Sequence, residues 1–175
     1  MLRRLRETGP GLLVPLAWTV VVGAHLGAVS IHALFVAHLV MAVLLPGFAV
    51  TGWTEMSVGV LRTWRSVVAV GFVATALGVV GFLLDVELLL AVALYAWMGL
   101  PAGGLLRTGA AVAAERTGSV APSFIDAATL PYLGGGVLCA LGVAVYAVST
   151  VSPLLGLVLV GVGQTAGILD AVVRY

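Results

Sequence analysis

Residues 11–53 read GLLVPLAWTVVVGAHLGAVSIHALFVAHLVMAVLLPGFAVTGW and contain no Asp, Glu, Lys or Arg. As one α-helix this stretch would be about 64 Å long, whereas the hydrocarbon core of a bilayer is about 30 Å thick. The run therefore has to fold back on itself as two helices. Its weakest helical segment is residues 27–32, GAVSIH, so we expect a tight turn near residues 28–31.

The composition of the whole chain places it in lipid. Hydrophobic residues make up 62 % of the sequence and charged residues 9 %, whereas soluble domains carry roughly 25 % charged residues. So few charges cannot cover the surface of a soluble protein of this size. The net charge of +1 indicates no nucleic-acid partner. The single cysteine, Cys139, excludes an internal disulfide and a thiolate-rich metal site, and we expect it to be a small buried hydrophobe.

Hydropathy along the chain predicts an all-α polytopic membrane protein, a bundle of six transmembrane helices in one integral membrane domain over residues 1–175. The cytoplasmic loops are expected at 52–64 and 108–128, although the Ala-rich first half of the second loop should extend the fourth helix until residues 121–123, APS, break it. The helices are expected at about 11–28, 32–51, 65–84, 86–107, 129–149 and 153–172.

The distribution of charge predicts the orientation. With both termini cytoplasmic, all eight arginines fall on one side, and the outer turns hold only Asp85 and Glu87. This arrangement satisfies the positive-inside rule. We therefore expect a multi-pass protein of the cell (plasma) membrane with both termini in the cytoplasm.

A weak internal repeat relates the third and fourth predicted helices to the fifth and sixth. Residues 71–105 and 135–169 are identical at eleven positions, which fits three in–out–in hairpin repeats but also fits two independent runs of small apolar residues. The alignment places Gly99 and Gly103 on Gly163 and Gly167. Such pairs of small residues four apart allow helices to approach closely, within one chain or between copies in a homo-oligomer.

Few residues in the predicted spans could carry chemistry. No Asp, Glu or Arg falls at mid-depth, so the chain lacks the carboxylate that a proton- or sodium-driven carrier usually needs. Motifs of hydrolases and phosphotransferases are absent, and we expect no enzymatic activity. The most polar group in the middle of a helix is Gln164-Thr165, which could line a solute path or hydrogen-bond to a neighbouring helix.

All three histidines, His25, His32 and His38, surround the first predicted turn. In a tight hairpin, His25 and His38 would lie on adjacent helices at similar depth, with His32 at the mouth. Neutral imidazole suits a divalent metal or haem iron, so a metal site and an axial haem pair are both candidates. Structural histidines near the membrane surface are the third interpretation.

The sequence accordingly favours a small-solute or metal-ion transport component, either a permease or the membrane subunit of a transporter. Two alternatives remain. One is a haem- or metal-binding membrane redox protein that uses His25 and His38, and the other is a non-catalytic membrane scaffold or assembly factor. The expected partners are the lipid bilayer and other membrane subunits or further copies of the chain.

Overall fold

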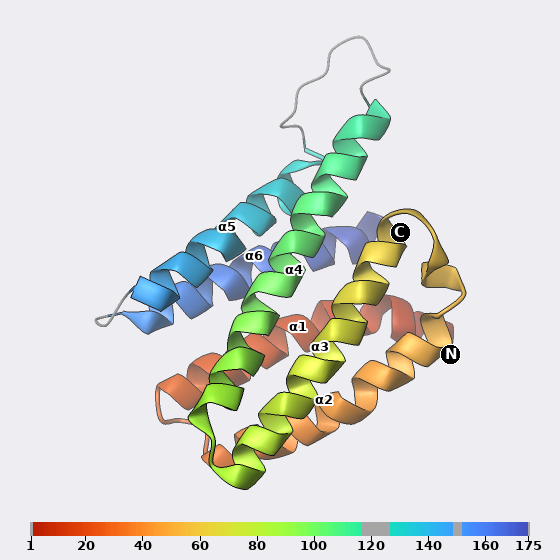
Figure 1. Ribbon diagram of the computed structural model, residues 1–175. Coiled ribbons are helices and arrows are strands. Elements are labelled where there is room, and N and C mark those ends of the chain that lie inside the picture. The colour runs from red at the N-terminus through yellow and green to blue at the C-terminus, as the bar shows by residue number, and fades with distance from the viewer. Residues whose placement is uncertain (1, 117–126, 149–151, 175) are drawn as a thin grey trace.

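The computed structural model describes residues 2–116, 127–148 and 152–174, and this part of the chain forms six α-helices and one short 3₁₀ helix without any strand (Figure 1). The elements are α1 (Leu2–His25), α2 (Ile31–Gly52), η1 (Glu55–Ser57), α3 (Gly59–Leu84), α4 (Glu87–Arg116), α5 (Leu130–Val148) and α6 (Pro153–Arg174). The all-α, six-helix prediction is confirmed.

The helices have the length and composition of membrane spans. Five of the described helices, α2 to α6, are long and apolar enough to cross a bilayer, and the apolar part of α1, Gly11–His25, is shorter. Large apolar side chains such as Val43, Val50 and Leu83 are exposed in the isolated chain. Because water would not tolerate so much contiguous apolar surface, lipid has to cover it. The chain is a multi-pass helical membrane protein.

The first turn is defined by two helix caps. Gly27 adopts a left-handed conformation with a φ of 72°, and the N–H of Ala28 donates to the carbonyl of Gly23 at 2.8 Å. This pattern is a Schellman motif, which ends a helix by satisfying its last carbonyls. Ser30 then caps α2, since its hydroxyl accepts from the N–H of Ala33 at 3.1 Å. The chain thus reverses over residues 26–30, close to the expected turn.

Other boundaries differ from those expected. The third helix begins at Gly59 and not at 65, so the second half of the predicted loop 52–64 is helical. Arg62 and Arg65 therefore lie inside α3. Long side chains at the membrane surface can reach water while the backbone remains helical, so the two charges do not interrupt the helix. The fourth helix continues to Arg116, as its Ala-rich extension indicated. The predicted break at 121–123 lies outside the described residues.

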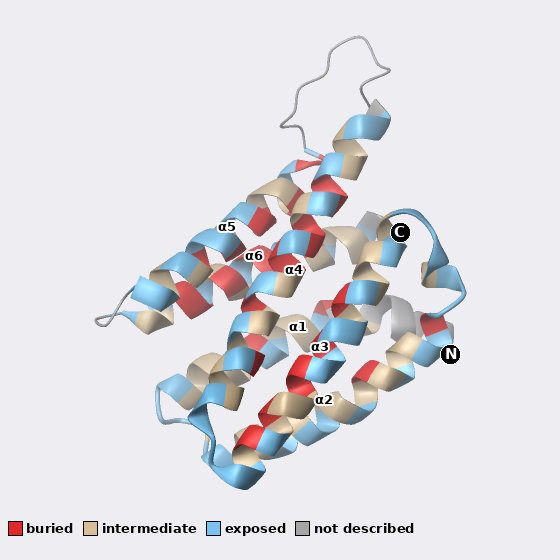
Figure 2. Ribbon diagram, viewed as in Figure 1, coloured by how far each residue is buried: buried red, intermediate tan, exposed pale blue. Residues whose placement is uncertain are grey.

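The tightest helix contact joins α5 and α6, and glycines make it possible. A Cβ on Gly135 would lie 2.5 Å from the carbonyl oxygen of Gly163, and one on Gly142 would lie 2.6 Å from that of Gly156. Such close approach gains dispersion and weak Cα–H···O contacts without any polar side chain. Figure 2 shows the buried residues concentrated on the facing sides of α3, α4, α5 and α6.

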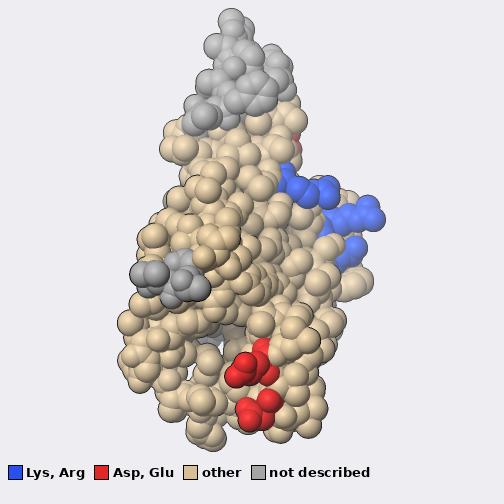
Figure 3. Space-filling view, turned by 60° about the vertical axis from the view of Figure 1, so that its left-hand side comes forward, with Lys and Arg blue, Asp and Glu red and all other residues tan. Residues whose placement is uncertain are grey.

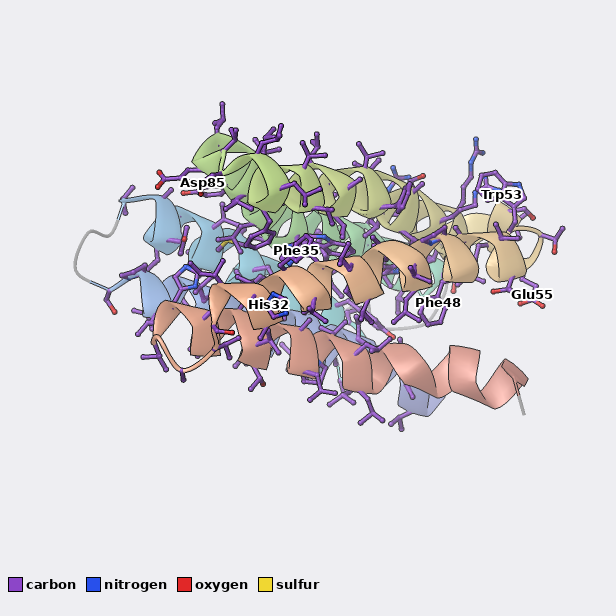
Figure 4. All side chains as sticks on the ribbon, turned by 90° about the horizontal axis from the view of Figure 1, so that it is seen from below. His32, Phe35, Phe48, Trp53, Glu55 and Asp85 are labelled. Carbon is purple, nitrogen blue, oxygen red and sulfur yellow. The ribbon has the colours of Figure 1, made fainter. Side chains whose placement is uncertain are left out.

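The first hairpin is splayed. Beyond the turn, α1 packs mainly against α6 and α2 mainly against α3, and the two helices share few contacts with each other. At the far end Phe48 reaches from α2 towards α1, with its ring 3.8 Å from the position of a Cβ on Gly9 (Figure 4). Only 6 % of the apolar window of α2 is buried, compared with 28 % or more in the other four spans. Most of α2 therefore faces the membrane.

Charged side chains mark the two ends of the bundle. Asp85 and Glu87 lie at the turn between α3 and α4, and the described arginines lie away from them towards the opposite end (Figure 3). At 1.5 Å per residue, Arg65 is about 28 Å from the end of α3 at Leu84, and Arg107 is about 30 Å from the start of α4. This separation matches the hydrocarbon thickness of a bilayer.

We predict that Gly163→Ala destabilises the bundle and that Gly99→Ala does not. A Cβ on Gly163 would collide with the carbonyl of Gly135 and lie 2.9 Å from the Cys139 sulfur, whereas a Cβ on Gly99 meets nothing within 4 Å. The expected loss for Gly163→Ala is about 1–3 kcal/mol. Thermal unfolding in detergent measures it, and equal melting temperatures for the two variants would contradict the assigned packing.

Candidate functional site

The side chain of Gln164 lies near the middle of α6 and is buried, with 3 % of its surface exposed. Its Oε1 accepts a hydrogen bond from the indole N–H of Trp18 on α1 at 3.0 Å. Its Nε2 donates to the backbone carbonyl of Trp97 on α4 at 2.9 Å. One carboxamide therefore joins three helices that are far apart in the sequence.

The carbonyl of Trp97 needs this donor because of Pro101. In a regular α-helix the N–H of residue 101 would donate to the carbonyl of residue 97, but proline has no N–H. An unsatisfied carbonyl inside a membrane costs several kcal/mol, so interior prolines persist where a neighbouring helix supplies a donor. Pro101 lies within α4, and Gln164 is the donor.

A second bond extends this arrangement to α3. The indole N–H of Trp97 donates to the hydroxyl of Thr75 at 2.9 Å, and that hydroxyl donates to the carbonyl of Gly71 at 2.9 Å. The Trp97 ring occupies the space that a side chain on Gly71 would take. We call Trp18, Thr75, Trp97, Pro101 and Gln164 the Gln164 junction; together they connect α1, α3, α4 and α6.

The Gln164 junction lies near the centre of the bilayer. Gln164 is about 16 Å along α6 from Pro153, and Trp97 is about 15 Å along α4 from Glu87. Both values are close to half of the hydrocarbon thickness of about 30 Å. The group contains an amide, two indoles, a hydroxyl and a freed carbonyl but no ionisable side chain. It can therefore exchange hydrogen bonds with an uncharged partner.

The sequence singled out Gln164 but missed its partners. Trp18, Trp97 and Thr75 look like ordinary apolar-segment residues, and nothing in their spacing relates them to Gln164. One signal was present: Pro101 removes the partner of the carbonyl four residues before it, and Gln164 is the most polar donor within the predicted spans. Thr165, the neighbour of Gln164, is half-buried and takes no part in this chain of bonds.

The two glycine pairs that the repeat alignment equated have different surroundings. Gly163 packs against Gly135 and Cys139 of α5, and Gly167 packs against Leu105 of α4. Gly99 and Gly103 instead face open space on the exposed side of α4. The first pair therefore serves packing within the chain, whereas the second pair lies on the surface of the bundle.

His25 forms part of an aromatic cluster at the C-terminal end of α1. Its Nδ1 lies 2.9 Å from the carbonyl of Val21, and its Nε2 lies 3.0 Å from the hydroxyl of Tyr146 on α5. Because a carbonyl only accepts, Nδ1 donates to the Val21 carbonyl, and Nε2 is within hydrogen-bonding distance of the Tyr146 hydroxyl. The Tyr146 ring also packs edge-on against Tyr95 of α4, with centroids 5.6 Å apart.

The other two histidines have different neighbours. His38 packs against α3, with its ring 5.0 Å from that of Phe82 and close to Gly78, while its Nδ1 lies 2.9 Å from the carbonyl of Leu34. His32 is exposed on the first turn of α2 (Figure 4). Within the described residues no three His, Cys, Asp or Glu side chains form a metal-binding group. A divalent metal or haem at His25 and His38 stays a prediction.

A cavity of about 240 Å³ opens beside His25 at the turn of the splayed α1–α2 hairpin. Its walls are otherwise apolar and come from Ala24, Val29, Ile31 and Leu34. Both nitrogens of His25 already have partners, so the cavity presents mainly carbon surface.

Comparison with protein-family models, curated proteins and solved structures finds no match to this chain. The class that the fold defines is therefore the multi-pass helical membrane protein described above, with a buried uncharged hydrogen-bonded junction at a proline in α4.

A double-mutant cycle tests the link between Gln164 and Pro101. Gln164→Leu leaves the Trp97 carbonyl and the Trp18 indole without their partner, and we expect it to lower the free energy of unfolding by about 1–2 kcal/mol. Pro101→Ala restores an N–H to α4, so Gln164→Leu should cost about 1 kcal/mol less in that background. Thr165→Val is the control. Equal costs in both backgrounds would show that Gln164 does not compensate for the proline.

The metal and haem predictions have a separate test in the purified protein. If His25 and His38 hold a metal ion or haem, the protein should contain that group in stoichiometric amount, with a Soret band in the case of haem. His25→Ala and His38→Ala should each abolish it. Elemental analysis and the absorption spectrum measure this, and a colourless, metal-free sample would contradict both predictions.

Proposed function

We propose that this protein is a membrane component that handles a small solute or metal ion, either as a permease or as the membrane subunit of a transporter. In this proposal the Gln164 junction is the point at which α4 bends to admit the solute. The observation that carries the proposal is the break in the hydrogen-bond ladder of α4 at Pro101, bridged from α6 by Gln164 at 2.9 Å.

The depth and chemistry of the junction support this role. Transporters commonly bind their substrates near the bilayer midplane, where interrupted helices expose backbone groups that a solute can use. The Trp97 carbonyl is such a group. The indole N–H of Trp18, which donates to the same Gln164 carboxamide, supplies a hydrogen-bond donor next to it. A solute with one donor and one acceptor can replace the carboxamide at both positions. Metal ions would use the oxygen atoms of Gln164 and Trp97.

The first hairpin supplies a second element of the proposal. The few contacts between α1 and α2 allow these helices to separate while α1 remains attached to α6 and α2 to α3. The cavity beside His25 lies at the turn end of this boundary. Since the Gln164 junction links α1 and α6 to α3 through Trp97 and Thr75, separation of the hairpin would pull directly on this junction.

Transport into proteoliposomes tests the proposal. The purified full chain, reconstituted and challenged with a panel of small amides, alcohols, vitamins and divalent metal ions, should give flux above that of protein-free liposomes for at least one compound. Gln164→Leu should change that flux at least tenfold, because it removes the bond that closes α4. Thr165→Val should leave it near the wild-type value. Flux that is absent for the whole panel, or identical in wild type and Gln164→Leu, would count against a permease.

A role as one subunit of a larger membrane complex is the second candidate. It is favoured by the small buried share of α2 and by the outward position of Gly99 and Gly103 on α4, where a foreign helix can approach closely. Gly99→Leu should then reduce recovery of a stoichiometric partner, such as an ATPase, from native membranes. Gly134→Leu is the matched control, because Gly134 lies against Leu130 of its own helix. If the chain purifies without a stoichiometric partner, and neither substitution changes that result, this candidate is wrong.

A further inference from the structure

Three arginines lie at one level on two neighbouring helices. Arg62 and Arg65 belong to α3 and Arg107 to α4, and the two helices pack extensively against each other. Measured at 1.5 Å per residue from the ends at the Asp85 turn, they lie about 33, 28 and 30 Å along their helices. Figure 3 shows the basic side chains gathered on one side of the bundle, well away from the acidic pair Asp85 and Glu87.

We propose that Arg62, Arg65 and Arg107 form a binding site for the phosphate group of an anionic phospholipid. Their spacing from the Asp85 turn equals the thickness of the hydrocarbon core, so their guanidinium groups lie at the depth of lipid headgroups. Guanidinium groups donate several hydrogen bonds in a planar array that suits phosphate oxygens. Basic sites between transmembrane helices bind anionic headgroups for this reason.

The backbone and aromatic contacts around the arginines hold the site in place. The guanidinium of Arg65 lies 4.5 Å from the ring centroid of Trp53 and donates to the Trp53 carbonyl at 3.4 Å. The indole N–H of Trp64 donates to the hydroxyl of Thr108 at 3.1 Å, which fixes α3 against α4 at this level. The three arginines therefore belong to helices whose relative position at this level is set by other contacts.

The charge balance at this level leaves the arginines available to an anion. Arg62 and Arg107 are exposed, and neither makes an ion pair with another described residue. Glu55 in η1 is not an ion-pair partner of Arg62, and Glu115 lies about 12 Å further along α4 than Arg107. The site is also open to the side of the bundle, where lipid lies, and its neighbour Trp53 is an exposed aromatic residue of the kind found at membrane interfaces.

Lipid titration of the full-length protein in neutral detergent tests this assignment. Adding phosphatidylglycerol should raise the melting temperature, followed by tryptophan fluorescence, more than adding phosphatidylcholine with the same acyl chains. Arg62→Gln combined with Arg107→Gln should weaken the phosphatidylglycerol effect about 25-fold in concentration, which corresponds to about fivefold for each charge removed. Arg65 is retained because its contact with Trp53 is structural.

Two control variants distinguish lipid binding at these arginines from a general effect of the protein's net charge. Arg62→Lys combined with Arg107→Lys keeps both positive charges and should keep most of the affinity. Asp85→Asn combined with Glu87→Gln changes as many charges at the other end of the bundle and should leave it unchanged. Equal stabilisation by the two lipids, or an undiminished phosphatidylglycerol effect in the glutamine variant, would overturn the proposal. So would full competition by millimolar inorganic phosphate, which would identify a soluble anion as the ligand.

Discussion

The hydrogen bond from Gln164 to the carbonyl of Trp97 is the interaction on which the arrangement of this bundle depends. Inside a membrane no water is present to satisfy a backbone group, so Pro101 creates a requirement that another helix has to meet. Gln164 meets it from α6 and, with its other end, accepts from Trp18 on α1. The Trp97 indole continues the connection to α3 through Thr75. A single local defect in α4 thereby specifies where three other helices lie.

Close backbone contact provides most of the remaining cohesion. Lipid is as apolar as the helix surfaces, so burial of apolar side chains supplies little driving force between helices in a membrane. Glycines on α5 and α6 instead let the backbones touch, at Gly135 with Gly163 and at Gly142 with Gly156. The α5–α6 pair is consequently the firmest part of the bundle, whereas the α1–α2 hairpin is held mainly at its ends.

This uneven distribution of contacts bears on function. The closely packed helices α4, α5 and α6 are connected to α1 through the packing of α1 against α6 and through the Gln164 junction, and to α2 through α3. Movement of the first hairpin would therefore act on the one place where the α4 ladder is already interrupted. His25 belongs to a third set of contacts, because its bond to Tyr146 joins the C-terminal ends of α1 and α5. The histidines are thus divided among helices, although the chain places them within fourteen residues.

The amino-acid sequence by itself determined the class of this protein. The uncharged run 11–53 is too long for one span and too apolar for water, so six helices, the first turn and the segregation of arginine from Asp85 and Glu87 follow from hydropathy and bilayer thickness alone. These properties are local, since they depend on residue type and on distance along the chain. The third helix began earlier than expected because charge at the membrane surface does not end a helix.

Only the tertiary structure decided which helices are neighbours and which way each face points. Gly99 and Gly163 occupy equivalent places in the repeat alignment, yet one faces open space and the other a backbone carbonyl. His25 and His38 flank one turn, yet they pack against α5 and α3. Helix rotation and pairing are set by contacts between residues distant in sequence, such as Trp18 with Gln164, and hydropathy is nearly the same on every side of a helix such as α2. The physical reason is that a lipid-facing surface and a helix-facing surface are both apolar, so the sequence pattern does not distinguish them.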